Sequence, residues 1–334
     1  MLVMRVIRVR EFGDPSVLKL EDAPPPAAAA GQAVIDVEVA AVLFGDTIVR
    51  GGRFPFPLPY TPGLEVGGRV AAVGPGGDEA LVGRRVVAVT PRTGGGYAEQ
   101  AVVDTRWLFE VPDGTALDDA VPVFQAGAVA LGMLGAMRLT AGETILITAA
   151  AGRLGSLLVQ AAKAAGATVI GAVGSSGKTA FVTALGADAV VDYSMPDWID
   201  QVTTATGGQG VDLALDAVGG AIGAGALAAL RDGAGRLGSY GFASGEWTPL
   251  DAGVIGRRGL SVVGAAGITF AKPEAEQRAD AERALSELAA GRLIPRIHAA
   301  FPLEGAPEAH AELEARSTIG AILLRPKSPY ESRN

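Results

Sequence analysis

The middle of the chain alternates short apolar runs with segments of helical periodicity. An apolar run at 145–147 breaks into small residues and restarts as an amphipathic pattern over 156–163, which predicts a strand, a tight turn and a helix. Further strands are predicted at 167–173, 189–192, 211–216 and 235–240, and further helices at 178–185 and 222–230. This alternation is typical of an open, doubly wound parallel sheet of the α/β class.

The first part of the chain has a different pattern, in which Pro and Gly punctuate short alternating runs. Strands are predicted at 34–39, 68–73 and 85–89. Together they favour a compact β-rich barrel.

After about residue 260 the pattern changes again, to a strand, an amphipathic helix over 273–290 and a final strand at 320–324. A chain that returns to its first lobe would show this order. We therefore predict one domain from 1–120 and 260–334, and a second domain from 121–259.

The turn between the first predicted strand of the middle region and its helix follows the dinucleotide fingerprint G-x-G-x-x-G, with Ala150 at the first glycine position. Gly152 would let the backbone approach a pyrophosphate, and Gly155 would let the helix pack closely on the strand. The helix N-terminus favours an anion. The turn predicts a dinucleotide site, although turns of small residues also join strands to helices without a ligand.

In a doubly wound sheet, ligands bind at the carboxyl ends of the strands. The segments expected to face a cofactor there are 174–175, 192–193, 217–219 and 241–242.

The residues after the second strand of the middle region indicate which nicotinamide cofactor is used. An NAD site offers an acidic residue at this place, but here the sequence is Gly174-Ser175-Ser176-Gly177-Lys178. Hydroxyls, backbone N–H groups and a lysine attract a 2′-phosphate, so we predict NADPH. The alternative is that Lys178 only begins a solvated helix.

Composition narrows the function classes. The chain has 334 residues, 49% of them hydrophobic, a net charge of −8 and no cysteine. The acidic balance argues against a nucleic-acid partner. No apolar run reaches membrane-spanning length and the start lacks a signal-peptide core, so we expect a cytoplasmic protein without a membrane partner. With only His298 and His310, each expected at the surface or partly buried, we predict no metal site.

Several ordered motifs together resemble the zinc-independent quinone oxidoreductase (zeta-crystallin-like) family of the medium-chain dehydrogenases and reductases. The matching segments are 9–15, 46–52, 62–65, 94–99, 149–155 and 316–320, with Lys178 and Tyr193. The resemblance covers essentially the whole chain. It implies a GroES-like β-barrel catalytic domain, a Rossmann domain and an active site in the cleft between the two lobes.

The resemblance also implies cofactor contacts. They fall on Ala151, Gly152, Arg153, Leu154 and Gly155 at the pyrophosphate turn, Gly174, Ser175 and Lys178 near the 2′-phosphate, Tyr193 near the adenosine end, Val218, Gly241 and Phe242 near the ribose or nicotinamide, and Arg316 as a further candidate. For Tyr193 the alternative is packing at a strand end, and for Arg316 it is a surface ion pair.

The chain departs from the family pattern at several positions. Leu43 and Leu64 stand where zinc-dependent relatives carry zinc ligands, in agreement with a metal-free enzyme. Leu43 and Ile48 also replace an asparagine and a tyrosine that border the nicotinamide and substrate in typical members. Arg153 replaces a glycine, and Ala321 stands where some relatives have lysine.

From these residues we predict hydride transfer from NADPH to a hydrophobic conjugated carbonyl acceptor, either a quinone or an enone. The expected apolar pocket contains Leu43, Ile48, Phe54 and Phe124. Asp46 and Arg50 are the nearest ionisable groups, and we favour a structural ion pair between them. No catalytic residue can be assigned from the sequence.

The alternatives are an enoyl-thioester or specialised-metabolite reductase, a non-redox biosynthetic enzyme of the cyclase type, and a binding protein. The apolar strand predicted at 259–266 would leave an open sheet edge, and with the family resemblance it suggests a homodimer.

Overall fold

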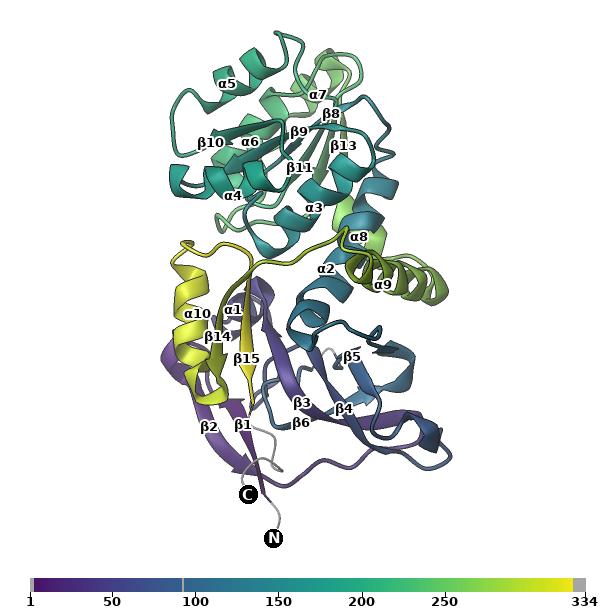
Figure 1. Ribbon diagram of the computed structural model, residues 1–334. Coiled ribbons are helices and arrows are strands. Elements are labelled where there is room, and N and C mark those ends of the chain that lie inside the picture. The colour runs from purple at the N-terminus through teal and green to yellow at the C-terminus, as the bar shows by residue number, and fades with distance from the viewer. Residues whose placement is uncertain (1–2, 92, 327–334) are drawn as a thin grey trace. The chain divides into compact units, whose positions relative to one another are not determined.

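The computed structural model describes residues 3–91 and 93–326, which form two compact units (Figure 1). The first unit consists of the described residues within 1–125 and 296–334, and the second unit is Ala126–Pro295. The second unit is therefore one continuous stretch of chain inserted into the first.

The second unit contains a six-stranded sheet in the order β10-β9-β8-β11-β12-β13, and every pairing is parallel. Its strands are β8 (Thr144–Ile147), β9 (Thr168–Val173), β10 (Ala189–Asp192), β11 (Leu213–Asp216), β12 (Arg236–Ser239) and β13 (Ser261–Gly264). Numbered along the chain, this order is 3-2-1-4-5-6, the order of a doubly wound dinucleotide-binding sheet. The predicted fold class is confirmed.

Helices alternate with these strands. They are α3 (Arg153–Ala164), α4 (Thr179–Ala184), α5 (Trp198–Ala205), α6 (Gly220–Ala228), α7 (Ala252–Arg258), α8 (Ala265–Phe270) and α9 (Glu274–Ala289), with a 3-10 turn at Ser176–Lys178. Leu146, Ile170 and Ala214 are buried from three adjacent strands in one core with Trp198 of α5 and Leu227 of α6. Both faces of these strands are apolar because helices cover a parallel sheet on both sides.

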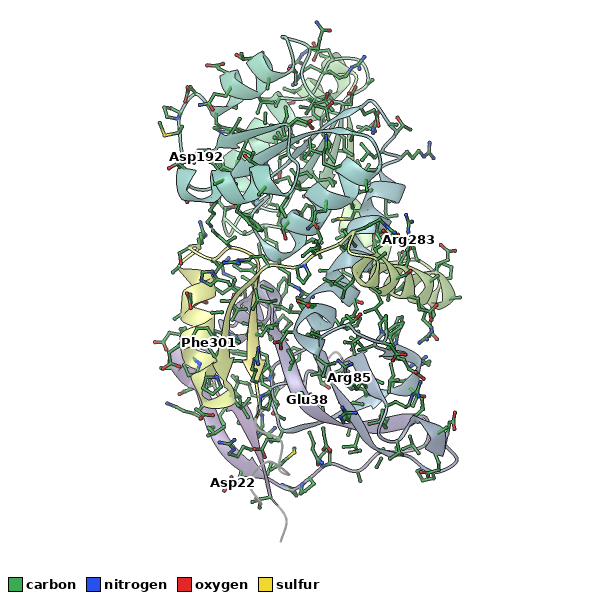
Figure 2. All side chains as sticks on the ribbon, in the orientation of Figure 1. Asp22, Glu38, Arg85, Asp192, Arg283 and Phe301 are labelled. Atoms are coloured by element: carbon green, nitrogen blue, oxygen red, sulfur yellow. The ribbon has the colours of Figure 1, made fainter. Side chains whose placement is uncertain are left out.

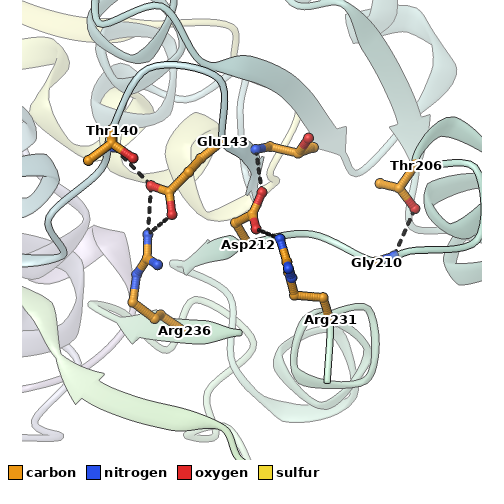
Figure 3. A network of polar contacts seen from close by, with 8 residues as sticks. Thr140, Glu143, Thr206, Gly210, Asp212, Arg231 and Arg236 are labelled. Atoms are coloured by element: carbon orange, nitrogen blue, oxygen red, sulfur yellow. Dashed lines mark hydrogen bonds and ion pairs between the residues drawn. The ribbon is translucent and has the colours of Figure 1, made fainter. Parts of the chain in front are cut away.

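Ion pairs connect the strands of this sheet at the edge where the strands begin. Glu143, just before β8, accepts two hydrogen bonds of 2.9 Å from Arg236 at the start of β12 (Figure 3). Asp212, just before β11, accepts from the Thr144 N–H at 2.8 Å and from Arg231 at 2.5 Å. We call this the amino edge, and it is held by contacts within the protein.

The first unit is built on a seven-stranded sheet with the path β14-β15-β3-β4-β5-β7, in which β6 also pairs with β3. The strands are β3 (Gln32–Val42), β4 (Glu65–Val73), β5 (Arg85–Val89), β6 (Gln100–Asp104), β7 (Leu108–Glu110), β14 (Ile297–Pro302) and β15 (Ala321–Arg325), and β1 (Met4–Val9) pairs with β2 (Leu18–Ala23). The pairs within this sheet are antiparallel except β14 with β15.

Helices and 3-10 turns connect the strands of the first unit. They are α1 (Phe44–Arg50), α10 (Ala306–Glu314) and the turns at Pro15–Val17, Glu79–Leu81, Thr105–Trp107 and Leu303–Gly305. A register shift at Val37/Val39 bends β3 near Glu38, which Figure 2 labels together with Arg85 on β5. A Cβ on Gly68, opposite this bend, would lie 1.9 Å from the Asp36 carbonyl oxygen, so only glycine fits there.

Helix α2 (Leu117–Ala136) begins in the first unit and ends in the second. The expectation that no apolar run reaches membrane-spanning length is wrong for this helix, which is long and apolar enough by length and composition. However, 72% of its apolar window is buried inside the protein, as is usual for the core helix of a soluble domain. It is the one such helix among the residues that the structure describes.

The return to the first unit also differs from the expected boundary at about 260. Strand β13 extends the parallel sheet by pairing with β12, and α9 buries Ala281, Ala284 and Leu285, so both belong to the second unit. The first unit resumes only at Arg296, just before β14. The hydrophobic pattern could not predict this boundary, because an edge strand and an amphipathic helix have the same pattern whichever unit they pack against.

Candidate functional site

The turn between β8 and α3 has the shape that a pyrophosphate site requires. Gly152 is the N-cap of α3 and provides no side-chain cap, so the first N–H groups of the helix receive no acceptor from it. A Cβ on Gly155 would lie 2.2 Å from the Ala149 carbonyl oxygen, so helix and turn can approach this closely only with glycine. Ala149 itself has φ 49°, a left-handed conformation that non-glycine residues rarely adopt.

Neighbouring strands bring further predicted residues to the same edge of the sheet, where the strands end; we call it the carboxyl edge. Gly174 follows β9, and a Cβ there would lie 3.0 Å from the Tyr193 hydroxyl, so this phenol lies against the glycine. Tyr193 follows Asp192, the last residue of β10 (Figure 2). Two of the predicted cofactor residues, Gly174 and Tyr193, are therefore in contact.

Ser175 directly precedes the 3-10 turn that follows β9, and Lys178 is the last residue of that turn. Ser175 is exposed and Lys178 is partly buried. Desolvation lowers the pKa of Lys178 from its ordinary value. A phosphate at this place would favour the charged ammonium and counteract that shift.

A buried carboxylate that sequence reasoning missed organises the loop after β11. Asp216 is fully buried and accepts four hydrogen bonds. Its Oδ1 accepts from Thr148 Oγ1 at 2.8 Å and the Val218 N–H at 3.0 Å, and its Oδ2 accepts from the Gly219 N–H at 3.0 Å and Thr248 Oγ1 at 2.8 Å. Thr148 also accepts from the Ala217 N–H at 3.0 Å. The sequence signal for this residue is an acidic residue at the end of an apolar strand. A carboxylate buried there needs hydrogen-bond donors from the protein.

The loops after β11 and β12 are fastened to each other. The Ala243 N–H donates to the Ala217 carbonyl at 3.0 Å, and the Ser244 N–H donates to the Val218 carbonyl at 2.8 Å. A Cβ on Gly241 would lie 2.6 Å from the Ala217 carbonyl oxygen. Val218, Gly241 and Phe242, which the family resemblance implies near the ribose or nicotinamide, thus lie on two loops that are hydrogen-bonded to each other.

Arg316 lies in the first unit, beyond the end of α10. It is exposed and has φ 59°, another left-handed conformation of a non-glycine residue. Such conformations cost free energy and collect at functional sites. This conformation supports Arg316 as a candidate cofactor contact, but it does not identify the group that Arg316 would bind.

The pocket candidates of the first unit divide into three environments. Leu43 is the N-cap of α1 and Ile48 is buried within it. Phe54 is 49% exposed. Phe124, which we expected to line the apolar pocket, is fully buried and packs against Phe109 with ring centroids 6.0 Å apart, so it is a core residue.

The favoured ion pair between Asp46 and Arg50 is wrong. Arg50, which is 2% exposed, pairs with Glu314 of α10 and donates to the Gly13 carbonyl at 3.0 Å. Asp46 instead accepts from the Leu43 N–H at 3.1 Å and from the Tyr97 hydroxyl at 3.2 Å. Both residues are structural groups with different partners.

A buried polar chain therefore runs from Asp46 through Tyr97 to His310. Burial raises the pKa of Asp46 to about 6, against its hydrogen bonds with Leu43 and Tyr97. The Tyr97 hydroxyl lies 3.1 Å from His310 Nε2. His310 is fully buried, contrary to the surface or partly buried position that we expected, and burial followed by the nearby Arg50 lowers its pKa to about 3.

The residues that the structure describes do not fit a zinc ion. Leu43 and Leu64 offer no ligand atom, and the sequence has no cysteine. Within residues 3–91 and 93–326, no group of three or more His, Asp or Glu side chains is placed to hold a metal ion. Metal independence itself stays a prediction.

Known proteins match both units of the chain. Residues 29–113 match the family model of the alcohol dehydrogenase GroES-like domain, and residues 154–288 match that of the zinc-binding dehydrogenases. A probable quinone oxidoreductase of Schizosaccharomyces pombe is 33% identical over 321 residues, covering 96% of each chain. A 2-haloacrylate reductase of a Burkholderia species is 31% identical over 342 residues, covering 98% of this chain and 100% of the relative.

A solved mycobacterial structure in complex with NADPH has the same fold. Its TM-score is 0.88 at 32% sequence identity, and the match covers 97% of this chain and 100% of the mycobacterial one. The likeness extends over both units.

Proposed function

Because the chain belongs to the zinc-independent quinone oxidoreductase family of the medium-chain dehydrogenases and reductases, we propose that it transfers a hydride from NADPH to a quinone or another conjugated carbonyl compound. The mycobacterial relative that binds NADPH supports the choice of cofactor. The turn at Gly152 and Gly155 supports dinucleotide binding, because its backbone leaves the N-terminus of α3 without a capping side chain.

The observation that carries the choice of NADPH over NADH is the polar turn after β9. No acidic side chain stands in the segment Gly174 to Lys178, where an NAD site offers one to the ribose. Lys178 is the last residue of this turn and is partly buried, and its ammonium would meet a 2′-phosphate as a point charge.

Cofactor titration tests this choice. We expect the unmodified protein to bind NADPH at least about tenfold more tightly than NADH, which corresponds to about 1.4 kcal/mol. Lys178→Ala should remove most of this preference by weakening NADPH alone. The matched control is Lys163→Ala, because the Lys163 ammonium is held by Asp188 at 2.8 Å. Equal affinities for the two cofactors in the unmodified protein, measured by fluorescence, would contradict the assignment.

The proposed hydride transfer requires no acid or base from the side chains of the protein. NADPH, when bound, supplies the hydride, and a reduced quinone takes its remaining proton from water. The chain must then position the acceptor and exclude water from it. Leu43 and Ile48, at the start and on the buried side of α1, suit a hydrophobic acceptor, whereas Asp46 is already engaged with Leu43 and Tyr97.

A second candidate is reduction of a conjugated carbon–carbon double bond, as in an enone or an enoyl thioester. It is favoured by the Burkholderia relative, whose name describes it as a 2-haloacrylate reductase. Stopped-flow oxidation of NADPH with matched quinones, enones and acyl thioesters separates the two. If no acceptor consumes NADPH, and a substrate is converted without cofactor, the protein is a non-redox enzyme and the proposal fails.

We also propose that the protein is a cytoplasmic homodimer. Strand β13 ends the parallel sheet with β12 as its neighbour, and the following α8 exposes Ile268 and Phe270. A second copy would cover this open edge. Light scattering that gives a monomer of 33.7 kDa at micromolar concentration would rule out the dimer.

A further inference from the structure

The segment 315–320 joins α10 to β15 in the first unit and carries Arg316, the candidate cofactor contact of that unit. Backbone hydrogen bonds hold its two ends. The Arg316 N–H donates to the Leu313 carbonyl at 3.2 Å, and the Ala321 N–H, just beyond the segment, donates to the Arg296 carbonyl at 2.7 Å. Between these two ends, the backbone of the segment is bonded to a side chain.

That side chain is His298, which contacts the segment through one ring nitrogen and α10 through the other. The Ile319 N–H donates to His298 Nδ1 at 3.2 Å. His298 Nε2 lies 2.8 Å from a Glu312 carboxylate oxygen. His298 belongs to β14 and Glu312 to α10, so one partly buried ring connects a strand, a helix and the segment that follows the helix.

The two contacts of the ring determine where its proton lies. A backbone N–H can only donate, so Nδ1 of His298 must accept and carries no proton. Nε2 then carries the proton and donates to the Glu312 carboxylate, which fixes both the tautomer and the orientation of the ring. A ring with a proton on Nδ1 would turn one N–H against that of Ile319 and release the segment.

This hydrogen bond bears on Arg316 because the segment is strained there. Arg316 has φ 59°, and such a conformation of a non-glycine residue persists only where the surrounding structure enforces it. The bond from Ile319 to His298 lies three residues further along and restricts how far the backbone can relax. An arginine on a backbone held in this way loses less conformational entropy when it binds an anion.

We propose that His298 is a positioning residue that acts through Arg316. By accepting from the Ile319 N–H, the neutral ring keeps Arg316 in the conformation in which it contacts NADPH, and His298 itself contacts neither the cofactor nor the acceptor. The inference rests on the proposed NADPH-dependent function and on Arg316 as a cofactor contact.

Two amide substitutions separate the two hydrogen bonds of the ring. In His298→Asn the side-chain oxygen takes the place of Nδ1 and can still accept from Ile319. In His298→Gln the longer side chain reaches the place of Nε2 and leaves Ile319 without its acceptor. We expect His298→Gln to weaken NADPH binding roughly 3- to 10-fold, and His298→Asn to change it less than about twofold. Calorimetric titration of the intact variants measures these affinities.

A double-mutant cycle with Arg316→Ala shows whether His298 acts through Arg316. Arg316→Ala alone should weaken NADPH binding at least as much as His298→Gln. In the Arg316→Ala protein, His298→Gln should then have no further effect, whereas an effect independent of Arg316 would add to the loss. Arg106→Ala is the matched control, because this arginine of the first unit is held by Asp104 at 2.7 Å, and it should bind NADPH like the unmodified protein.

The tautomer of His298 gives a readout that does not depend on binding. The chain has two histidines, His298 and His310, so the imidazole nitrogen signals in NMR spectra of tag-free protein can be assigned by their loss in His298→Asn. In the cofactor-free protein at mildly alkaline pH, we expect the proton of the His298 ring on Nε2.

Several results would overturn the inference while leaving the proposed function intact. They are an unchanged NADPH affinity in His298→Gln or in Arg316→Ala, an equal loss in His298→Asn, a loss from His298→Gln that persists in the Arg316→Ala protein, and a proton on Nδ1 of His298. If the unmodified protein does not bind NADPH, the proposed function itself fails, and the inference fails with it.

Discussion

At the amino edge of the parallel sheet, Glu143 receives Arg236 and Asp212 receives Arg231 (Figure 3), so carboxylates meet cations of the same protein. At the carboxyl edge, Asp216 is surrounded by neutral donors, and the N-cap residue of α3 provides no capping side chain. One sheet thus has an amino edge held by internal ion pairs and a carboxyl edge at which, in our proposal, the start of α3 offers donors to the cofactor. Stability and binding should therefore respond differently to changes at the two edges.

The largest effect is expected from Gly155→Ala at the carboxyl edge. The new Cβ would lie 2.2 Å from the Ala149 carbonyl oxygen, so the backbone of the turn must move. We expect NADPH affinity to fall about 100-fold, or about 2.7 kcal/mol, and stability to fall by about 1–3 kcal/mol. Gly135→Ala in α2 is the control, because its Cβ would meet no atom within 4 Å. Normal NADPH binding by Gly155→Ala would refute the role of this close approach.

A pair of carboxylate variants compares the edges directly. Asp216→Asn places an amide where Gly219 and Thr248 donate, and we expect a loss of about 2–3 kcal/mol of unfolding free energy together with weaker NADPH binding. Asp212→Asn at the amino edge should cost about 1 kcal/mol or less, because its partner Arg231 is 49% exposed, and it should bind NADPH normally. Urea unfolding gives the stability of both variants, and titration gives their NADPH affinities. Similar losses at the two sites would remove the distinction.

The buried carboxylate of the first unit extends the comparison to pH. The pKa of Asp46 is about 6 in the folded protein and close to 3.8 when unfolded, so between these values the folded state binds more protons. Stability due to Asp46 is therefore greatest at low pH and falls as pH rises from about 4 to 6, by at most about 1.4 kcal/mol per pH unit. Asp46→Asn should lack this slope. Parallel stability curves for variant and parent across this range would show that Asp46 does not titrate there.

Local patterns in the sequence predicted much of the fold. The strands at Arg85–Val89 and Ala189–Asp192 have the predicted bounds, because a short apolar run between turn residues leaves little freedom in where a strand begins and ends. The glycines at 152 and 155 were identified because a close backbone approach tolerates little else. The boundary near 260 was wrong, since patterning does not say which sheet an edge strand joins.

The missed site residues depend on long-range contacts. His310 meets Tyr97, and Thr148 meets Asp216, across long stretches of chain, and neither pairing leaves a periodic signal. Arg50 was assigned to Asp46 because the two lie close along the chain, whereas folding brings Glu314 to it instead.

The pairing of Leu324 with Ala40 has a consequence for biosynthesis. Ala40–Val42 of β3 are synthesised before the second unit, but β15, the strand that pairs with them, is synthesised only after it. The whole second unit is synthesised in between and has time to fold as a unit. Until β15 has been synthesised, Ala40–Val42 lack this pairing partner, and an unpaired strand edge is a site at which nascent chains can aggregate.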